Sequence, residues 1–468
     1  MKRTGETAHD EDRQVGEGEG VGARRASSMA ERRHRLRRSP SVRAAFALVL
    51  AALGVVAVVL GARAIVRDPL GTSTVRAGQA VAGGAAAEPS PGASAHVDAA
   101  QAIKPAAQGT IVWALSARFG STQFALAQST CAGTPCPVLL RTQDGGRTWQ
   151  QVHAFTQADV SSAQGDAQPL IQPAGAISEL RFLDARTGYL FGSDLWVTHD
   201  AGRTFTQVQH PGVSVLDVAA HDGQAFALTG ASCIQGGCSG RIEVARIGTG
   251  RAPAVADAVA GVTPSGEVAD ARLVTAGKNL LVLTRAERSG GDASGAWRLT
   301  GGALTPLAAP PACNGKPLEA AAGLGSTSRM LAVCDAVVTA RATSYSSVTS
   351  ADGGATWQLA GAGNLSLPTQ GHVSLAAKDA THVVATSGGP REALDGTTRS
   401  LPDVAVAASA DGGRTWRRAT VTPAPAPGGF DSLQARQPGT SAVTRHDGDV
   451  WSSADNGLHW SRHSVSSR

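Results

Sequence analysis

Five aspartates recur at one position of an eight-residue motif, and acidic side chains repeated in this way could ligate a metal ion or act as general acids and bases. The motif reads Ser/Thr-x-Asp-x-Gly-x-x followed by an aromatic residue, and its aspartates are Asp144, Asp200, Asp352, Asp411 and Asp455. Between 44 and 152 residues separate one aspartate from the next. Because each carboxylate then belongs to its own repeat, the five cannot converge on one ion or substrate. We interpret them as structural.

The residues around each aspartate are typical of a turn between two strands. An Asp side chain can accept hydrogen bonds from the backbone N–H groups of the turn that follows it, and the glycine after it can adopt a positive φ. The large ring at the end of the motif fits a half-buried strand and can bury against the neighbouring sheet. The rings are Trp149, Phe205, Trp357, Trp416 and Trp460.

The motif resembles the Asp-box, or bacterial neuraminidase repeat, of sialidases, sortilin-type receptors and the photosystem II assembly and stability factors. The stretch from Phe182 to Tyr189, followed by its box, is similar to the repeats of the last group. The resemblance covers most of residues 109–465. It implies a β-propeller in which each box marks a hairpin, but it does not specify a function. In sialidases the boxes lie away from the active site.

The spacing of the boxes predicts the number of repeats. Gaps of 56, 59 and 44 residues between box aspartates indicate a unit of about 50, so the gap of 152 residues should contain two units whose boxes have decayed. A second hairpin pattern recurs at 112–127, 180–192, 215–228, 271–283, 320–333, 373–386 and 433–444. Two strands there and two around each box predict an all-β propeller of seven contiguous four-stranded blades over residues 109–468. A β-sandwich is the alternative, but it gives no reason for one turn to repeat at this period.

The first hundred residues predict a tail, an anchor and a linker. Residues 1–43 are polar and charged, which is typical of disorder, and they end in a basic run. Residues 44–62 are apolar and uncharged, long enough for a transmembrane helix, and the basic run predicts that the N-terminus is cytoplasmic. Residues 63–108, rich in Ala, Gly and Pro, predict a linker. A cleaved signal peptide is the alternative, because Ala62-Arg63-Ala64 has the form of a cleavage site, and Arg37-Arg38 also allows a twin-arginine signal.

The charge of the chain favours a membrane surface over nucleic acid. The net charge is +5, and residues 1–67 hold 13 Lys and Arg against 7 Asp and Glu, so the remainder is close to neutral. Basic residues beside the apolar segment serve orientation and attraction to anionic lipid. We therefore expect no nucleic-acid partner. The abundance of Ala, Gly and Arg is typical of a bacterium with a GC-rich genome.

The six cysteines all follow the apolar segment, which suits an oxidising compartment. Two pairs have the same spacing, each within one repeat, and this predicts local disulfides. The third pair then follows by elimination. The expected pairs are Cys131 with Cys136, Cys233 with Cys238, and Cys313 with Cys334. A metal site is the alternative for the two short pairs, but no histidines flank them at ligand spacing.

The resemblance to sialidases raises the question of catalysis, since those enzymes need a Tyr nucleophile assisted by a Glu, an acid/base Asp and an arginine triad. The chain has only Tyr189 and Tyr345, and Tyr189 falls in an aromatic packing position of the repeat. Glu179 and Glu319 are the carboxylates that could be argued for a catalytic pair. We expect no enzyme activity, no cofactor and no metal site.

Binding residues are sought on the innermost strands, which line the channel of a propeller. Arg181, Arg272 and Arg436 fall on the strands expected there and could hold an anionic ligand. The sequence thus predicts a single-pass cell-membrane protein whose propeller lies outside and binds a protein or an envelope glycan. A glycoside hydrolase of the sialidase or xyloglucanase type is the alternative.

Overall fold

The fold is described from a computed structural model. It describes residues 97–465, with gaps at 157, 159–175, 235–236, 249–253, 287–293, 339–341, 362, 368–371, 389–390, 393–397, 400–405, 424–431, 437–438 and 444–448. These residues belong to one unit, Ser90–Arg468. The tail predicted at 1–43, the transmembrane helix predicted at 44–62 and the linker up to residue 96 lie outside the described residues. No helix in the described part of the chain is long and apolar enough to span a bilayer.

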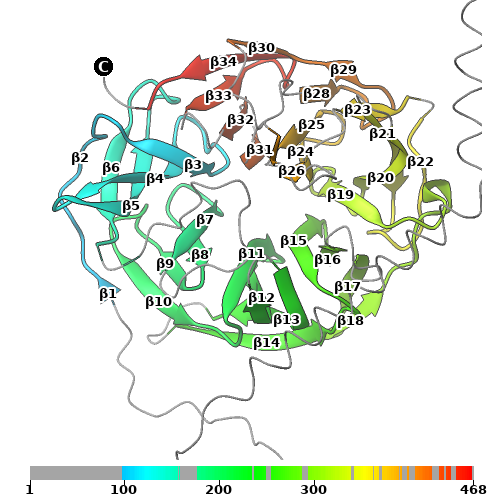
Figure 1. Ribbon diagram of the computed structural model, residues 1–468, viewed down its shortest axis with the longest axis horizontal. Coiled ribbons are helices and arrows are strands. Elements are labelled where there is room, and N and C mark those ends of the chain that lie inside the picture. The colour runs from blue at the N-terminus through cyan, green and yellow to red at the C-terminus, as the bar shows by residue number, and fades with distance from the viewer. Residues whose placement is uncertain are drawn as a thin grey trace, which may run out of the picture. The chain divides into compact units, whose positions relative to one another are not determined.

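Groups of four successive antiparallel strands, called sheets here, follow one another around a ring (Figure 1), and hydrogen bonds also join the second, third and fourth groups to one another. The first contains Ile111–Leu115 (β3), Gln123–Cys131 (β4), Thr134–Thr142 (β5) and Gln150–Ala154 (β6). The second contains Ile177–Phe182 (β7), Gly188–Gly192 (β8), Leu195–Thr198 (β9) and Phe205–Gln209 (β10). The third contains Ser214–His221 (β11), Gln224–Ile234 (β12), Gly237–Ile247 (β13) and Ala254–Val262 (β14). The fourth contains Val268–Ala276 (β15), Asn279–Ala286 (β16), Gly295–Thr300 (β17) and Ala303–Pro306 (β18).

The remaining sheets carry short additions. The fifth contains Leu318–Gly323 (β19), Met330–Val338 (β20), Thr343–Ser350 (β21) and Gln358–Leu359 (β22), with Leu365–Leu367 (β23) on β21 and the 3-10 turn Pro311–Cys313 (η1) before it. The sixth contains His372–Ala377 (β24), Val383–Gly388 (β25), Val406–Ser409 (β28) and Arg417–Arg418 (β29), with a hairpin of Arg391–Glu392 (β26) and Thr398–Arg399 (β27). The last contains Ser432–Arg436 (β31), Gly439–Val443 (β32), Val450–Ser453 (β33) and His459–His463 (β34), with Thr420–Thr422 (β30) parallel to β34.

The first strand of each sheet lies nearest the centre of the ring (Figure 1). Contacts run from β3 to β7, from β11 through β15, β19 and β24 to β31, and from β31 back to β3, while β8 contacts β11. Radially arranged four-stranded sheets define the β-propeller. Two groups of four strands, β11–β14 and β15–β18, lie between the second and third boxes.

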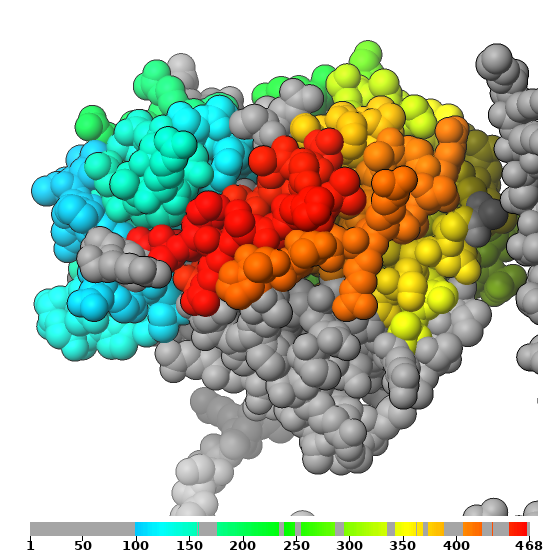
Figure 2. Space-filling model, turned by 90° about the horizontal axis from the view of Figure 1, so that it is seen from above, coloured from blue at the N-terminus to red at the C-terminus, as the bar shows by residue number. Residues whose placement is uncertain are grey.

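The ring closes by side-chain packing. The first and last sheets are each built from one continuous segment and exchange no strand with one another in the described residues. Val450 and Val465 of the C-terminal segment are buried in the same cluster as Val112 and Val138 of the first sheet. Figure 2 shows the C-terminal strands, in red, lying directly against the N-terminal sheet, in cyan. Apolar burial therefore stabilises this junction.

The folded unit begins earlier than the sequence predicts. The sequence predicts a linker through residue 108, but Val97–Asp98 (β1) pairs with β10 and Lys104–Pro105 (β2) pairs with β6. Ala106 is 3% exposed and packs in the core of the first sheet. The Ala-rich composition that suggests a linker is also compatible with an extended segment that pairs with a sheet edge, because strand pairing uses backbone groups.

Candidate functional site

The five box aspartates hold their own turns. In the first box, Asp144 Oδ1 accepts hydrogen bonds from Thr148 N and the Thr142 hydroxyl, and Asp144 Oδ2 accepts one from the Thr148 hydroxyl. The same pattern occurs at Asp200, Asp352 and Asp411, and at Asp455 the residue that replaces the second Thr is His459. The Thr356 hydroxyl and backbone N–H lower the pKa of Asp352 to about 2. These carboxylates therefore stay ionised, and their oxygens accept hydrogen bonds from the backbone and side chains of their own turns.

Four of the five boxes also bond to the turn between the first two strands of their own sheet. Gly145 N donates to Ser121 O, and Gly412 N donates to Thr381 O. Ala201 N and Gly353 N make the equivalent bonds to Arg186 O and Ser328 O. This bond therefore ties the outer hairpin of a sheet to its inner one.

The box rings pack as anchors between sheets. Trp149, Phe205 and Trp460 are buried, while Trp357 and Trp416 are partly buried against core clusters. Trp416 Nε1 donates to the Ser347 hydroxyl of the preceding sheet at 2.9 Å. The rings thus provide apolar area at the junctions between sheets.

Charged residues gather on three consecutive inner strands, β7, β11 and β15. Arg181 Nη2 lies 2.8 Å from Asp217 Oδ1, and Arg181 Nε donates to Val218 O. Asp217 is 2% exposed, and its Oδ2 accepts a hydrogen bond from Leu273 N on β15. A single buried carboxylate therefore connects three sheets of the ring, and Arg181 serves as its counter-ion.

Three acidic residues hold equivalent places in this cluster. Each of the three strands has a β-bulge, and the first residue that pairs again after the bulge is acidic. These residues are Glu179 in β7, Asp217 in β11 and Asp270 in β15. Bulges re-aim side chains, so they give these strands a common acidic position. Sequence reasoning missed Asp217 and Asp270, because a bulge leaves no sequence signature here. The only available signal was an acidic residue on the inner strand of three successive repeats.

Arg272 is the most exposed member of the cluster. Its Nε lies 3.1 Å from Asp270 Oδ1, yet half of its side chain, 50%, is exposed. The negative charge of Asp270, with smaller contributions from Asp217 and Glu179, raises the pKa of Arg272 above its usual value. Arg285 contacts the other oxygen of Asp270 at 4.0 Å. Arg272 is therefore a permanent cation presented from an inner strand.

The other predicted site residues are dispersed. Arg436 lies in β31, which contacts β3 and β24, and its side chain lies outside the described residues. Glu319 lies at the bulge of β19. Tyr189 is 1% exposed, and burial, with the charge of Asp184, raises its pKa to about 12. A phenol so buried packs the core, as the sequence predicts, and Tyr345 is buried as well.

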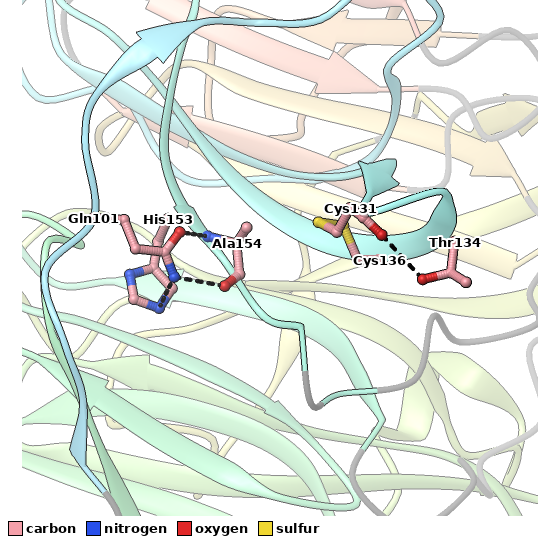
Figure 3. Close-up of a disulfide and its surroundings, with 6 residues drawn as sticks. All are labelled: Gln101, Cys131, Thr134, Cys136, His153 and Ala154. Atoms are coloured by element: carbon pink, nitrogen blue, oxygen red, sulfur yellow. Dashed lines mark hydrogen bonds between the residues drawn. A yellow bond between two sulfur atoms is a disulfide. The ribbon is translucent and has the colours of Figure 1, made fainter.

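The cysteines are paired as the sequence predicts: Cys131 with Cys136, Cys233 with Cys238, and Cys313 with Cys334. The first disulfide joins β4 to β5 at the end of their hairpin (Figure 3). The third joins η1 to β20. Among the described residues no group of three or more His, Cys, Asp or Glu side chains could hold a metal ion.

No protein-family model and no curated protein matches the chain. Several solved structures align with it at low identity. YCF48 bound to D1 peptide is 16% identical over 68% of this chain and 84% of that chain, with a TM-score of 0.40. The β-propeller domain of the Trilobed protease from Pyrococcus furiosus is 5% identical over 77% and 99%, with a TM-score of 0.43. The GH74 xyloglucanase from Xanthomonas campestris is 13% identical over 75% and 48%, with a TM-score of 0.24. The propeller assignment therefore rests on the strand arrangement of this chain.

Proposed function

We propose that this protein is a membrane-anchored, extracytoplasmic β-propeller of seven Asp-box-type blades that serves as a binding or assembly module for a protein or an envelope glycan. The blade number is supported by the repeat length and by the succession of inner strands β3, β7, β11, β15, β19, β24 and β31. The location is supported by the apolar segment at 44–62, the basic run before it and the cysteines after it.

The observation that carries the binding role is the half-exposed Arg272, which is paired with Asp270 on the same inner strand. Asp217 and Asp270 are both paired with arginines, and the box aspartates are occupied by their turns. Arg272 keeps an exposed guanidinium whose planar donors match carboxylate or phosphate groups. The inner-strand cluster therefore suits recognition of an anionic group on the partner.

The binding role is tested with the full chain in detergent micelles, applied to arrays of acidic peptides and of envelope polysaccharide fractions. We expect one class to be retained, and Arg272→Ala to weaken its binding at least tenfold, since a charged hydrogen bond contributes about 1.5–3 kcal/mol. Arg147→Ala is the matched control, because Arg147 is an exposed arginine of the first box. Equal loss in both variants, or no loss in Arg272→Ala, would contradict the proposal.

A glycoside hydrolase is the second candidate, favoured by the three carboxylates that β7, β11 and β15 bring to equivalent positions. Hydrolysis requires two carboxyl groups about 5–10 Å apart on either side of the scissile bond. The same arrays report it as released reducing sugar. If reducing sugar is released, and if both Asp270→Asn and Glu179→Gln abolish this release, the protein is an enzyme rather than a binding module.

The orientation is tested on intact cells by adding an external protease. We expect the propeller to be digested while an epitope placed before residue 43 is protected. Protection of both would refute the extracytoplasmic location.

A further inference from the structure

Residues 97–106, termed the strap, run along the outer edges of the first two sheets. β1 pairs with β10 at Val97 and Asp98, and β2 pairs with β6 at Lys104 and Pro105. Ala106 N then donates to the carbonyl of Trp149. The strap thus adds a strand to each sheet edge, which is the geometry by which proteins recognise extended peptides.

Gln101 fixes the strap between its two short strands. Its side-chain amide donates to Ala154 O at 2.8 Å, and its Oε1 accepts from Ala154 N at 2.9 Å (Figure 3). The amide therefore takes the place that a strand residue would occupy beside Ala154. The same Nε2 lies 3.5 Å from Nε2 of His153, whose ring is fully buried.

The strap itself is held by little burial. Ala106 is its only buried side chain among those described, Gln101 and Ile103 are half-buried, and Lys104 and Pro105 are exposed. The edge beneath it is the opposite, because Val152, His153 and Ala154 are all buried. One alanine and two half-buried side chains contribute far less apolar burial than the strands that they cover. The strap therefore adds little apolar burial of its own, and it is held to the edge mainly by backbone pairing and by the two bonds of Gln101.

We propose that the outer edges of β6 and β10 form a strand-addition site for an extended peptide of a partner protein, and that the strap occupies this site until the partner displaces it. The strap defines the partner's chemistry. We expect the partner's peptide to carry an amide side chain, a branched aliphatic residue two positions later and a small residue three positions after that. The strap has this pattern in Gln101, Ile103 and Ala106.

Displacement would also change the reach of the folded unit. Residues 97–106 would leave the sheet edges and extend the preceding chain by up to about 33 Å, at about 3.3 Å per residue. The site lies on the outermost strands, whereas Arg272 lies on an inner one. Binding at the strap site is thus separable from binding at the inner-strand cluster.

The probe is a fluorescein-labelled peptide of residues 96–108, titrated against the full chain in detergent and followed by anisotropy. In the variant Gln101→Ala with Ala106→Asp, the strap loses its side-chain bonds and its buried residue. We expect this variant to bind the peptide at least tenfold more tightly than the wild type, where the strap competes from within the same chain. A peptide carrying the same two substitutions is the matched control and should bind at least tenfold more weakly.

Two outcomes overturn the proposal. One is a folded variant, with native circular dichroism and tryptophan fluorescence, that does not bind the peptide. The other is a variant that unfolds, since the strap would then be an integral part of the first two sheets. Hydrogen exchange on the wild-type full chain provides an independent measurement. We expect the amides of residues 97–106 to exchange at least tenfold faster than those of β5, and exchange only together with β5 would also overturn it.

Discussion

The sheets that carry the box and the two that lack it are stabilised by different kinds of contact. The first, second, fifth, sixth and last sheets carry the motif, whereas β11–β14 and β15–β18 do not. In the box sheets, the aspartate and the hydroxyl residue two positions before it satisfy the turn locally. The next backbone N–H ties the turn to the inner hairpin in four of these sheets. These links connect residues that are close in the sequence or within one sheet.

The sheets without the box use links between sheets. β14 pairs in parallel with β10 of the preceding sheet, and β13 pairs with β15 of the following one, so β7–β18 belong to one continuous hydrogen-bonded network. β12 and β13 are each 11 residues long and are joined by Cys233–Cys238. Asp217 adds bonds to β7 and β15. Where the local turn chemistry is lost, backbone pairing and a buried charge between neighbours stabilise the ring.

The largest expected effect is that of Asp217→Ala in the region without boxes. The change removes the carboxylate that Arg181 Nη2 contacts and the acceptor of Leu273 N. Breaking a buried ion pair costs about 3–5 kcal/mol, and the expected cost here lies at the lower end because the Arg181 side chain is 27% exposed. The free energy of unfolding is measured by urea titration. Asp257→Ala, an exposed position on β14, is the control and should change it by less than about 0.5 kcal/mol. Equal effects would mean that Asp217 does not hold the sheets together.

A matched pair of glycines tests the box side of the comparison. Gly413 has a φ of +88°, and a Cβ there would lie 2.4 Å from Cδ1 of Leu331, a buried side chain of the preceding sheet. Gly146 has a φ of +95° but would meet only Arg118, at 3.9 Å. We expect Gly413→Ala to cost about 2–4 kcal/mol, from backbone strain and overpacking, and Gly146→Ala about 1–2 kcal/mol, from strain alone. Similar urea midpoints for the two variants would show that the box does not pack tightly between sheets.

The smallest effect is on the pH dependence of stability. Burial lowers the pKa of His221 and of His210 from 6.5, so the unfolded chain binds more protons below that value and stability falls as the pH drops from about 6.5. The pKa of the box aspartate Asp352 is lowered to about 2. Its contribution to the stability of the fold is therefore complete above about pH 3.8 and is lost as the pH falls through about 2.

Urea midpoints measured from pH 8 to pH 2 should therefore show a plateau and two declines. His221→Gln should reduce the upper decline and Asp352→Asn the lower one. If neither substitution changes the dependence of the urea midpoint on pH, neither His221 nor Asp352 contributes to the pH dependence of stability.

Sequence reasoning succeeded where the signal is local and repeated. The boxes predicted the strands that flank them, and the equal spacing of two cysteine pairs predicted their disulfides. Sequence reasoning placed Arg181 and Arg272 on inner strands, but it treated them as a basic lining. The structure shows them in a mixed cluster whose acidic members are set by bulges.

By itself the sequence determined the turns, because the donor and acceptor groups of each box lie within four residues and need no partner from elsewhere. Only the tertiary structure decided what crosses between sheets. Asp217 and Leu273 are 56 residues apart, and Gln101 and Ala154 are 53 apart. Contacts at such separations depend on strand register and on the closing of the ring, which a pattern of residue types along one chain does not encode. The strap shows this most clearly, because its composition is that of a linker and only its backbone pairing makes it part of the fold.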